Sequence, residues 1–241
     1  MKSNTTLLKL CLLLTIICLP FLSRAHGYWL ETQGSGKIGE PVKILMFFGE
    51  YAEAIREKGN KLDKMADLKV SVIDVIGKQS AINMVQKETH WEGTFTPTTN
   101  GNYQILAIND TREVQDFTKH NLGITRPVQF MRTTYQVGKA SATNAKNLQF
   151  LDVTTNQENG KITLSAFKDK QALAKTKLTI INPQTWEKTK FTNENGQTTF
   201  TPTGKGLYLV ELEWIDTNPG TFKGKDYQTI RYKSEMTFVL D

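Results

Sequence analysis

The chain has 241 residues, with 30 lysine and arginine residues against 24 aspartate and glutamate residues, a formal net charge of +6. Three of the basic residues lie in residues 1–25, so the remaining 216 residues carry a net charge of only +3, spread along the sequence. A charge this weak and even argues against a nucleic-acid-binding protein. A length of 216 residues is typical of two domains of about 100 residues each.

Residues 1–25 have the pattern of a secretory signal peptide. They carry Lys2 and Lys9, continue with the apolar run LCLLLTIICLPFL and end with small residues, Ser23 and Ala25, at the −3 and −1 positions of a cleavage site. The apolar run is too short for a comfortable membrane span, and Pro20 interrupts it. We therefore expect an exported, periplasmic protein of a Gram-negative bacterium, with no membrane span in the mature chain.

The cleavage position decides which residue begins the mature protein. A cut after Ala25 makes His26 the first residue, whereas a cut after Gly27 starts the chain at Tyr28. The small-residue pattern favours the first cut. Both cysteines of the chain lie in the removed segment, so the mature protein has no disulfide and depends on its hydrophobic core.

The mature sequence is dominated by short β-branched or aromatic runs separated by Gly, Asn, Pro and Asp, which is typical of β-strands. One segment, residues 51–65, has a helical pattern and predicts a short helix on a loop. The first half predicts seven strands: 26–31, 41–48, 68–75, 80–87, 91–97, 102–109 and 127–137.

The two halves of the mature chain repeat one pattern. TFTPTTNGNY (94–103) matches TFTPTGKGLY (199–208) at a constant offset of 105 residues, and KVSVID (69–74) fits KLTIIN (177–182) at an offset of 108. A repeat of this length indicates duplicated domains. We therefore predict an all-β protein of two tandem immunoglobulin-like β-sandwich domains, residues 26–140 and 146–241, meeting in the small polar segment 138–147.

The repeated segment also predicts a specific packing feature. Pro97 and Pro202 each end a strand, because proline lacks the N–H group that a strand ladder needs. Tyr103 and Tyr208 each begin the next strand after a glycine turn. The arrangement resembles a tyrosine corner, in which the aromatic ring packs at a bend of the sandwich.

Three histidines follow the signal peptide: His26, His90 and His120. Because successive strands of a sandwich alternate in direction, the start of the first strand and the loops that hold His90 and His120 should share one end of the first domain. Taken singly, each histidine fits an ordinary surface or core position. Their shared end instead favours a transition-metal site, since imidazole is the commonest ligand of such ions.

An N-terminal histidine adds a specific possibility, because its α-amine and ring nitrogen can chelate one ion together. His90 or His120, or both, would supply further nitrogen ligands, and such a set suits Ni(II) or Cu(II). The sequence therefore predicts a nickel or copper site formed by His26 with one or two further histidines. The nearby oxygen donors considered are Glu50, Glu53, Glu88 and Asp116.

Several short segments together resemble the NikM-like family of exported bacterial domains, which is associated with nickel uptake and otherwise of unknown function. They are the signal peptide, AHGYWLE, GEPVKILMFFGE and the chain end KDYQTIRYKSEMTFVL. The resemblance covers essentially the whole mature chain and implies a periplasmic β-sandwich protein that takes part in transition-metal uptake. Its matching metal position is His26, and it assigns neither His90 nor His120.

The start of the mature chain also looks like that of lytic polysaccharide monooxygenases, whose N-terminal histidine and a later histidine hold copper. Those enzymes usually carry disulfides, which this mature chain lacks. The sequence contains no G-x-S-x-G, H-E-x-x-H or C-x-x-C motif and no phosphate-binding glycine loop. We therefore expect a protein that is not an enzyme, with a copper monooxygenase as the lesser alternative.

Two functional readings follow. The first is a metal-binding protein that assists metal uptake or delivery, with a membrane metal transporter or outer-membrane receptor as its partner. The second is an interaction module without metal, in which the two sandwiches present loops to a membrane receptor or permease. If maturation leaves Tyr28 first, the chelate cannot form and the second reading holds.

Overall fold

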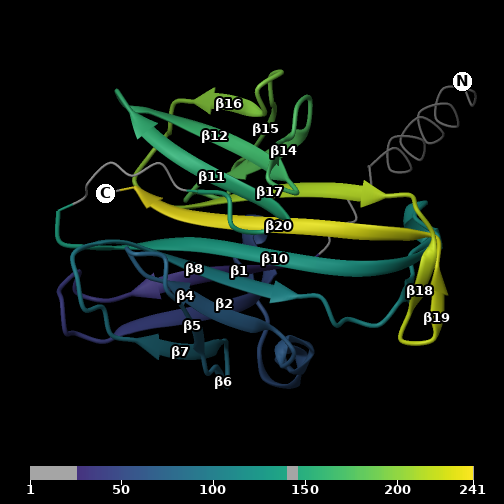
Figure 1. Cartoon of the computed structure of the whole chain (residues 1–241), viewed down its shortest axis with the longest axis horizontal. Helices are drawn as coiled ribbons and strands as arrows, with labels where there is room; N and C mark the ends of the chain where they lie inside the picture. Colours follow the sequence, from purple (N-terminus) through teal and green to yellow (C-terminus); the bar gives the residue numbers. More distant parts are fainter. Residues whose placement is uncertain (1–25, 140–145, 241) are drawn as a thin grey trace, which may run out of the picture.

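A nine-stranded sheet runs through the middle of the molecule and takes strands from both halves of the chain (Figure 1). The computed structural model describes residues 26–139 and 146–240, so the expected signal peptide lies outside the described residues. The order across the sheet is β15-β14-β17-β20-β10-β8-β4-β5, with the short β9 beside β10. The bounds are β4 (Lys69–Ile73), β5 (Gln79–Ile82), β8 (Gly101–Asn109), β9 (Gln115–Asp116), β10 (Ile124–Val137), β14 (Lys177–Ile181), β15 (Glu187–Phe191), β17 (Gly206–Asp216) and β20 (Thr229–Leu240).

A smaller sheet covers each face of the central sheet, one above it and one below it in Figure 1. The chain also forms the hairpin β18 (Gly220–Phe222) and β19 (Lys225–Tyr227). The first small sheet contains β1 (Gly27–Gln33), β2 (Val42–Glu50), β3 (Ile55–Arg56), β6 (Val85–Gln86) and β7 (Trp91–Phe95). The second contains β11 (Leu151–Glu158), β12 (Lys161–Lys168), β13 (Gln171–Ala172) and β16 (Gln197–Phe200).

The two small sheets enclose separate hydrophobic cores on opposite faces of the central sheet. Strand β10 shows this directly, since successive side chains of a strand point to opposite faces. Its Met131 and Tyr135 belong to the core under the first small sheet, whereas Val128 and Phe130 belong to the core under the second. The molecule therefore consists of two β-sandwiches whose larger sheets are fused edge to edge.

The fusion is a parallel pairing of β10 with β20, in register from Thr125 opposite Thr229 to Arg132 opposite Met236. Each half repeats the same strand order, β1-β2-β7 facing β5-β4-β8-β10 and β11-β12-β16 facing β15-β14-β17-β20. Parallel neighbours with cores on opposite faces are related by an approximate two-fold axis along the strands. The predicted fold, two tandem immunoglobulin-like β-sandwiches, is confirmed.

The tyrosines of the repeated segment form matching corners. In both copies the hydroxyl accepts hydrogen bonds from backbone N–H groups four and five residues upstream, at 3.0 to 3.2 Å. Tyr103 donates to the carbonyl of Thr99 at 3.0 Å, and Tyr208 donates to that of Gly204 at 2.9 Å. Both rings are buried. The predicted tyrosine corner is thus present in each sandwich.

Two predicted elements differ from the structure. The predicted strand 80–87 is split into β5 on the central sheet and β6 on the first small sheet. The predicted helix 51–65 forms two 3-10 helices, Tyr51–Glu53 and Gly59–Met65, with β3 between them. Left-handed backbone at Ala54 (φ 55°) and Gly59 (φ 60°) interrupts an α-helical path there. The predicted domain ranges stay a prediction, since 140–145 lie outside the described residues.

A fully buried ion pair joins the two sandwiches. The Arg132 guanidinium of β10 lies 2.7 Å from Oδ2 of Asp152 on β11, and the two side chains are 1% and 0% exposed. Arg132 also donates to Gln104 at 2.7 Å, and Asp152 accepts from the backbone N–H of Leu148 at 2.7 Å. Burial raises the pKa of Asp152 even though Arg132 opposes this. The pair therefore fixes the start of the second sandwich to the last strand of the first.

A second buried charge lies on β20. The Glu235 side chain is fully buried, accepts a hydrogen bond from the Gln129 amide and lies 3.2 Å from Nζ of Lys233. Burial raises the pKa of Glu235 to about 7, against the opposing charge of Lys233. In the described part of the chain, no helix has both the length and the apolar character needed to span a membrane.

Removing one partner of the buried pair should be strongly destabilising, because it leaves the other charge buried and unpaired. We expect Arg132→Met and Asp152→Leu each to lower the free energy of unfolding by about 3–5 kcal/mol, and the double variant to lose less than the sum. Denaturant titration measures this. The control is Glu194→Gln, which removes an exposed pair with Lys175 and should cost at most about 1 kcal/mol. Equal, small effects for all variants would contradict the role of the pair.

The raised pKa of Glu235 predicts a pH-dependent stability. Because the folded-state value of about 7 exceeds the unfolded-state value near 4.5, the folded state binds more protons between these values. Proton binding by Glu235 therefore stabilises the folded state fully below pH 4.5, and this stabilisation is lost as pH rises through 7. The loss in the free energy of unfolding is at most about 3 kcal/mol. Glu235→Gln should remove this loss between pH 5 and 8, as measured by denaturant titration. Glu213→Gln, at a partly exposed site, serves as control, and an unchanged pH profile in Glu235→Gln would refute the assignment.

Candidate functional site

A polar cavity of about 610 Å³ opens where the start of β1 meets the outer face of the second half of the central sheet. We call it the histidine cavity. Its walls come from both sandwiches, from the first strand and loops of one and the central strands of the other. The lining residues are His26, Tyr28, Phe48, Glu57, Lys61, Lys64, Arg112, Gln115, Phe117, His120, Leu122, Gln129, Glu213, Arg231 and Lys233.

His26 lies at the mouth of this cavity with its side chain 44% exposed. Its Nε2 is 2.9 Å from Oε1 of Glu57, and its ring packs against Phe48 with centroids 5.1 Å apart. Lys61 donates to the other oxygen of Glu57 at 2.6 Å. The hydrogen bond from Lys61, followed by that from His26, holds the pKa of Glu57 below its usual value. Glu57 is therefore a carboxylate that already faces the imidazole.

Glu57 was not among the carboxylates that the sequence suggested. The short strand β3 pairs with the end of β2, and the backbone N–H of Glu57 donates to the carbonyl of Phe48 at 2.8 Å. This pairing turns the Glu57 side chain toward His26. The sequence pattern gave no signal for it, because β3 is only two residues long. None of the four carboxylates considered from the sequence lines the histidine cavity: Glu50, Glu53, Glu88 and Asp116.

His120 lines the same cavity from the loop between β8 and β10. It ends the 3-10 helix Thr118–His120, and its ring meets Phe117 edge-on at 6.0 Å. The Asp116 carboxylate accepts a hydrogen bond from the backbone N–H of Thr118 at 2.8 Å and so fixes the start of this turn. The loop and β1 thus bring His26 and His120 to one cavity, as the strand directions predicted.

His90 lies at the expected end of the sandwich but on another face. The backbone N–H of Gly59 donates to the carbonyl of Glu88 at 2.8 Å, so the turn that holds His90 does touch the loop after β2. The His90 ring, however, packs against Phe47 at 5.5 Å. Since Phe47 and Phe48 are successive residues of β2, they point to opposite faces of the sheet. The structure therefore does not bring His90 to the histidine cavity.

The floor of the cavity combines cations with carboxylates, of which Glu235 is fully buried and Glu213 is exposed. Arg231 lies 2.5 Å from Glu213, and Lys233 lies 3.2 Å from Glu235. A Cβ built on Gly27 would lie 3.5 Å from Oε1 of Glu235 and 3.7 Å from that of Glu211. The backbone beside His26 therefore rests directly over two acidic side chains. Lys233 already pairs with both of these carboxylate oxygens, at 3.2 Å from Glu235 and 3.9 Å from Glu211.

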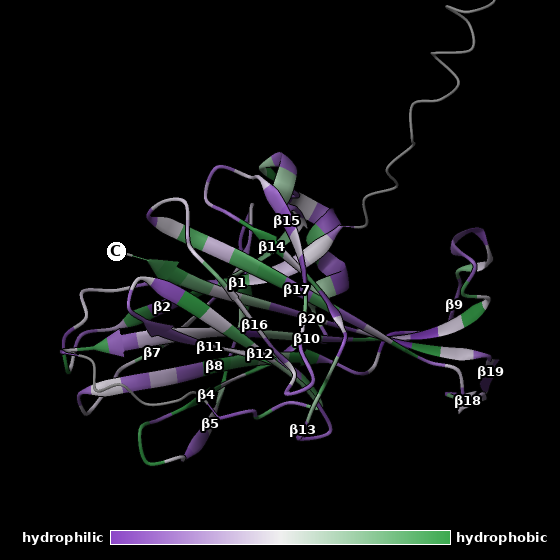
Figure 2. Cartoon of the chain, turned by 90° about the horizontal axis from the view of Figure 1, so that it is seen from above, coloured by the Kyte–Doolittle hydropathy of each residue, from purple (hydrophilic) through white to green (hydrophobic). Residues whose placement is uncertain are grey.

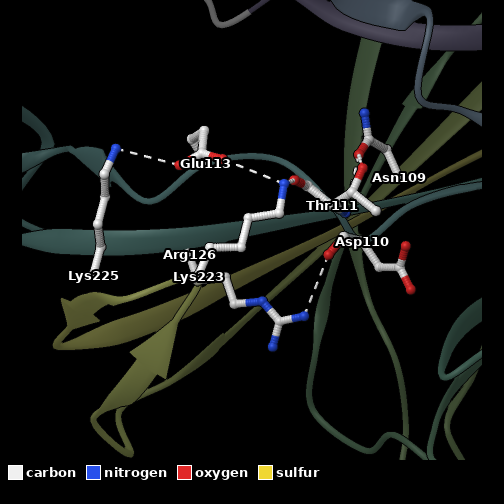
Figure 3. Close-up of polar contacts among 7 residues, drawn as sticks. All are labelled: Asn109, Asp110, Thr111, Glu113, Arg126, Lys223 and Lys225. Carbon is white, nitrogen blue, oxygen red and sulfur yellow. Dashed lines mark hydrogen bonds and ion pairs between the residues drawn. The ribbon is translucent and has the colours of Figure 1, made fainter.

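The loop that carries His120 is braced by the second sandwich (Figure 3). Lys223 of the β18–β19 hairpin donates to the carbonyl of Thr111 at 2.7 Å and lies 3.3 Å from Glu113. Lys225 lies 3.2 Å from the other oxygen of Glu113. Figure 2 shows β9 and this hairpin together at the projecting end of the long central strands. Both sandwiches therefore hold the loop in place.

Within residues 26–139 and 146–240, no group of three or more histidine, cysteine, aspartate or glutamate side chains is placed to hold a metal ion. An N-terminal chelate needs fewer side chains, because the α-amine of His26 would be one of the ligands. The donors available to such a chelate in the histidine cavity are the imidazoles of His26 and His120 and the carboxylates of Glu57 and Glu213, of which Glu213 is paired with Arg231. These donor types suit borderline metals such as Ni(II), Cu(II) and Zn(II).

Comparison with known proteins gives distant structural likenesses. No family model matches this sequence, and neither does any curated protein. The D0-D1 domain of intimin is 11% identical, with a TM-score of 0.26 over 90% of this chain and 100% of that one. A tetra-tandem repeat from the extending region of a large adhesion protein is 10% identical, with a TM-score of 0.28 over 90% of this chain and 50% of that one. The BSP domain of a biofilm-associated protein is 10% identical, with a TM-score of 0.24 over 87% of this chain and 29% of that one. Likenesses at these TM-scores carry no argument about function.

Proposed function

We propose that this is an exported transition-metal-binding protein that holds Ni(II) or Cu(II) in the histidine cavity and assists metal uptake or delivery. The observation that carries the proposal is that His26 and His120, far apart in sequence, line one cavity together. His26 would supply its ring nitrogen and α-amine, and His120 a further imidazole. The resemblance of the mature N-terminus to the NikM-like family supports the same reading.

Glu57 has two roles in the proposed metal site. In the metal-free protein it accepts the hydrogen bond from His26 at 2.9 Å and so orients the ring. On metal binding it would either become an oxygen ligand or keep the ring oriented through its second nitrogen. The partner of such a protein would be a membrane metal transporter or receptor.

The rival reading is an interaction module that presents its loops to a membrane protein without metal. N-terminal sequencing of the secreted chain distinguishes the two at once. A mature chain that begins with His26 keeps the chelate, whereas one that begins with Tyr28 has neither its imidazole nor the correctly placed amine.

The three histidines should contribute unequally. We expect His26→Ala to abolish tight Ni(II) and Cu(II) binding by the mature protein, and His120→Ala to weaken it at least about tenfold, or 1.4 kcal/mol. His90→Ala is the matched control and should leave the affinity unchanged, because its ring lies on another face of the sheet. Titration calorimetry with both metals measures this. Equal losses in His26→Ala and His90→Ala would contradict the proposed site.

The role of the α-amine can be isolated by one added residue. A chain that starts at His26 should bind metal at least about tenfold more tightly than one that starts at Ala25, because the second has an amide in place of the amine. Affinity of the first chain should also fall as pH drops below 6, since protons compete for imidazole and amine. Equal affinity of the two chains would show that the chelate is not used.

A further inference from the structure

A second cavity, of about 390 Å³, lies on the opposite face of the central sheet. We call it the aromatic cavity. It is formed where the segment leading into β11 meets the outer face of the first sandwich's half of the central sheet. Its apolar lining includes Leu106, Ile108, Val128, Phe130, Phe150 and Tyr232. Its polar lining residues are Lys69, Ser71, Gln79, Asp110, Arg126 and Gln149.

The approximate two-fold axis relates this cavity to the histidine cavity. The repeated segments make Phe95 and Phe200 equivalent, and these residues pair with Val42 and Ile162. Following the strand registers from these pairs makes Phe48 equivalent to Lys168, and Tyr28 equivalent to Leu151. His26 precedes Tyr28 by two residues and Gln149 precedes Leu151 by two, so His26 is equivalent to Gln149.

The same registers show how the two cavities differ. The tyrosine corners make Ile108 of β8 equivalent to Glu213 of β17. On the paired strands, Val128 and Phe130 of β10 stand where β20 has Arg231 and Lys233. The architecture therefore creates a cavity at the same place in each sandwich. At these three equivalent positions, the side chains are charged in the histidine cavity and apolar in the aromatic cavity.

The aromatic cavity has the composition of a small-molecule site, an apolar wall with a few polar groups. Phe150 and Tyr232 contact each other with ring centroids 4.8 Å apart, and Leu106, Val128 and Phe130 are buried beneath. Gln149 holds the wall in place by donating from its amide to the carbonyl of Ala107 at 3.1 Å.

Two polar atoms of lining residues have no hydrogen-bond partner within the described residues. They are Nε of Arg126, a donor, and Oε1 of Gln149, an acceptor, and both are buried. Leaving such a buried atom unpaired costs about 1–3 kcal/mol.

The charge of Arg126 is also unmatched by any carboxylate in the described ranges. Its guanidinium lies over the Phe222 ring at 4.0 Å and donates to the backbone carbonyl of Asp110 at 3.3 Å (Figure 3). The Asp110 carboxylate instead pairs with Lys69 at 3.3 Å. The cavity therefore carries one net positive charge beside an apolar wall.

We propose that the aromatic cavity binds a small amphipathic monoanion, a ring-containing carboxylic acid. Its carboxylate accepts hydrogen bonds from Arg126, and its ring covers Leu106, Ile108 and Phe150. This site is independent of the metal proposed for the histidine cavity.

The test uses 2-naphthoate as the probe and the neutral 2-naphthalenemethanol as its uncharged counterpart, titrated into the mature protein by calorimetry. Naphthoate should bind at least about tenfold more tightly than the alcohol, because only the anion uses Arg126. Arg126→Gln should remove this preference and leave alcohol binding within about threefold. Leu148→Trp should weaken both probes at least about tenfold, because Leu148 lines the cavity and is 40% exposed, so the larger side chain fills space without disturbing the core.

Lys188→Gln, which removes an exposed cation from the edge strand β15, is the matched charge control and should change nothing. His26→Ala should also leave naphthoate affinity unchanged, which separates this site from the metal site. Thermal unfolding of each variant establishes that it is folded. No binding of naphthoate, equal binding of the alcohol, or unchanged affinity in Leu148→Trp would each overturn the proposal.

Discussion

The parallel pairing of β10 with β20 is the constraint on which the rest of the structure depends. It joins two sandwiches into one central sheet and places their cores on opposite faces. Without it, the start of β1 would not meet β17 and β20, and the segment before β11 would not meet β8 and β10. Both cavities are consequences of this junction, because each cavity is lined by residues from both sandwiches. The buried pair of Arg132 and Asp152 stabilises the same junction.

Much of the fold could be predicted because local patterns carried it. The repeated Thr-Phe-Thr-Pro-Thr segment and its tyrosine predicted two sandwiches with matching corners, and the hydrogen bonds of Tyr103 and Tyr208 are those of such corners. The parallel junction was not predictable in this way. It joins strands about 100 residues apart, and no turn or spacing in the sequence marks which edges of two sandwiches will pair.

The candidate site could also be predicted in part, where it depends on strand direction alone. Strand direction placed His26 and His120 at one end, because alternation along the chain is enough to decide that. The face on which His90 points depends on the exact register of β6, β7 and β2, and one residue of shift reverses it. Glu57 was missed because β3, the strand that positions it, is too short to leave a pattern. The wall of the histidine cavity that Arg231 and Lys233 supply depends on the parallel pairing of β10 with β20. No sequence pattern predicted that pairing, so none could predict this wall either.

The position of β20 at the end of the described chain has a consequence for how the protein reaches its native state. Until Thr229–Leu240 joins the sheet, β10 is an unpaired edge strand whose exposed backbone is available to other chains. Closing a loop of about 100 residues to form a parallel pair is intrinsically slow. Polar residues are buried along this edge in the native sheet: Gln129, Arg132 and Thr133. Polar side chains in an exposed edge strand oppose aggregation until β20 pairs with it.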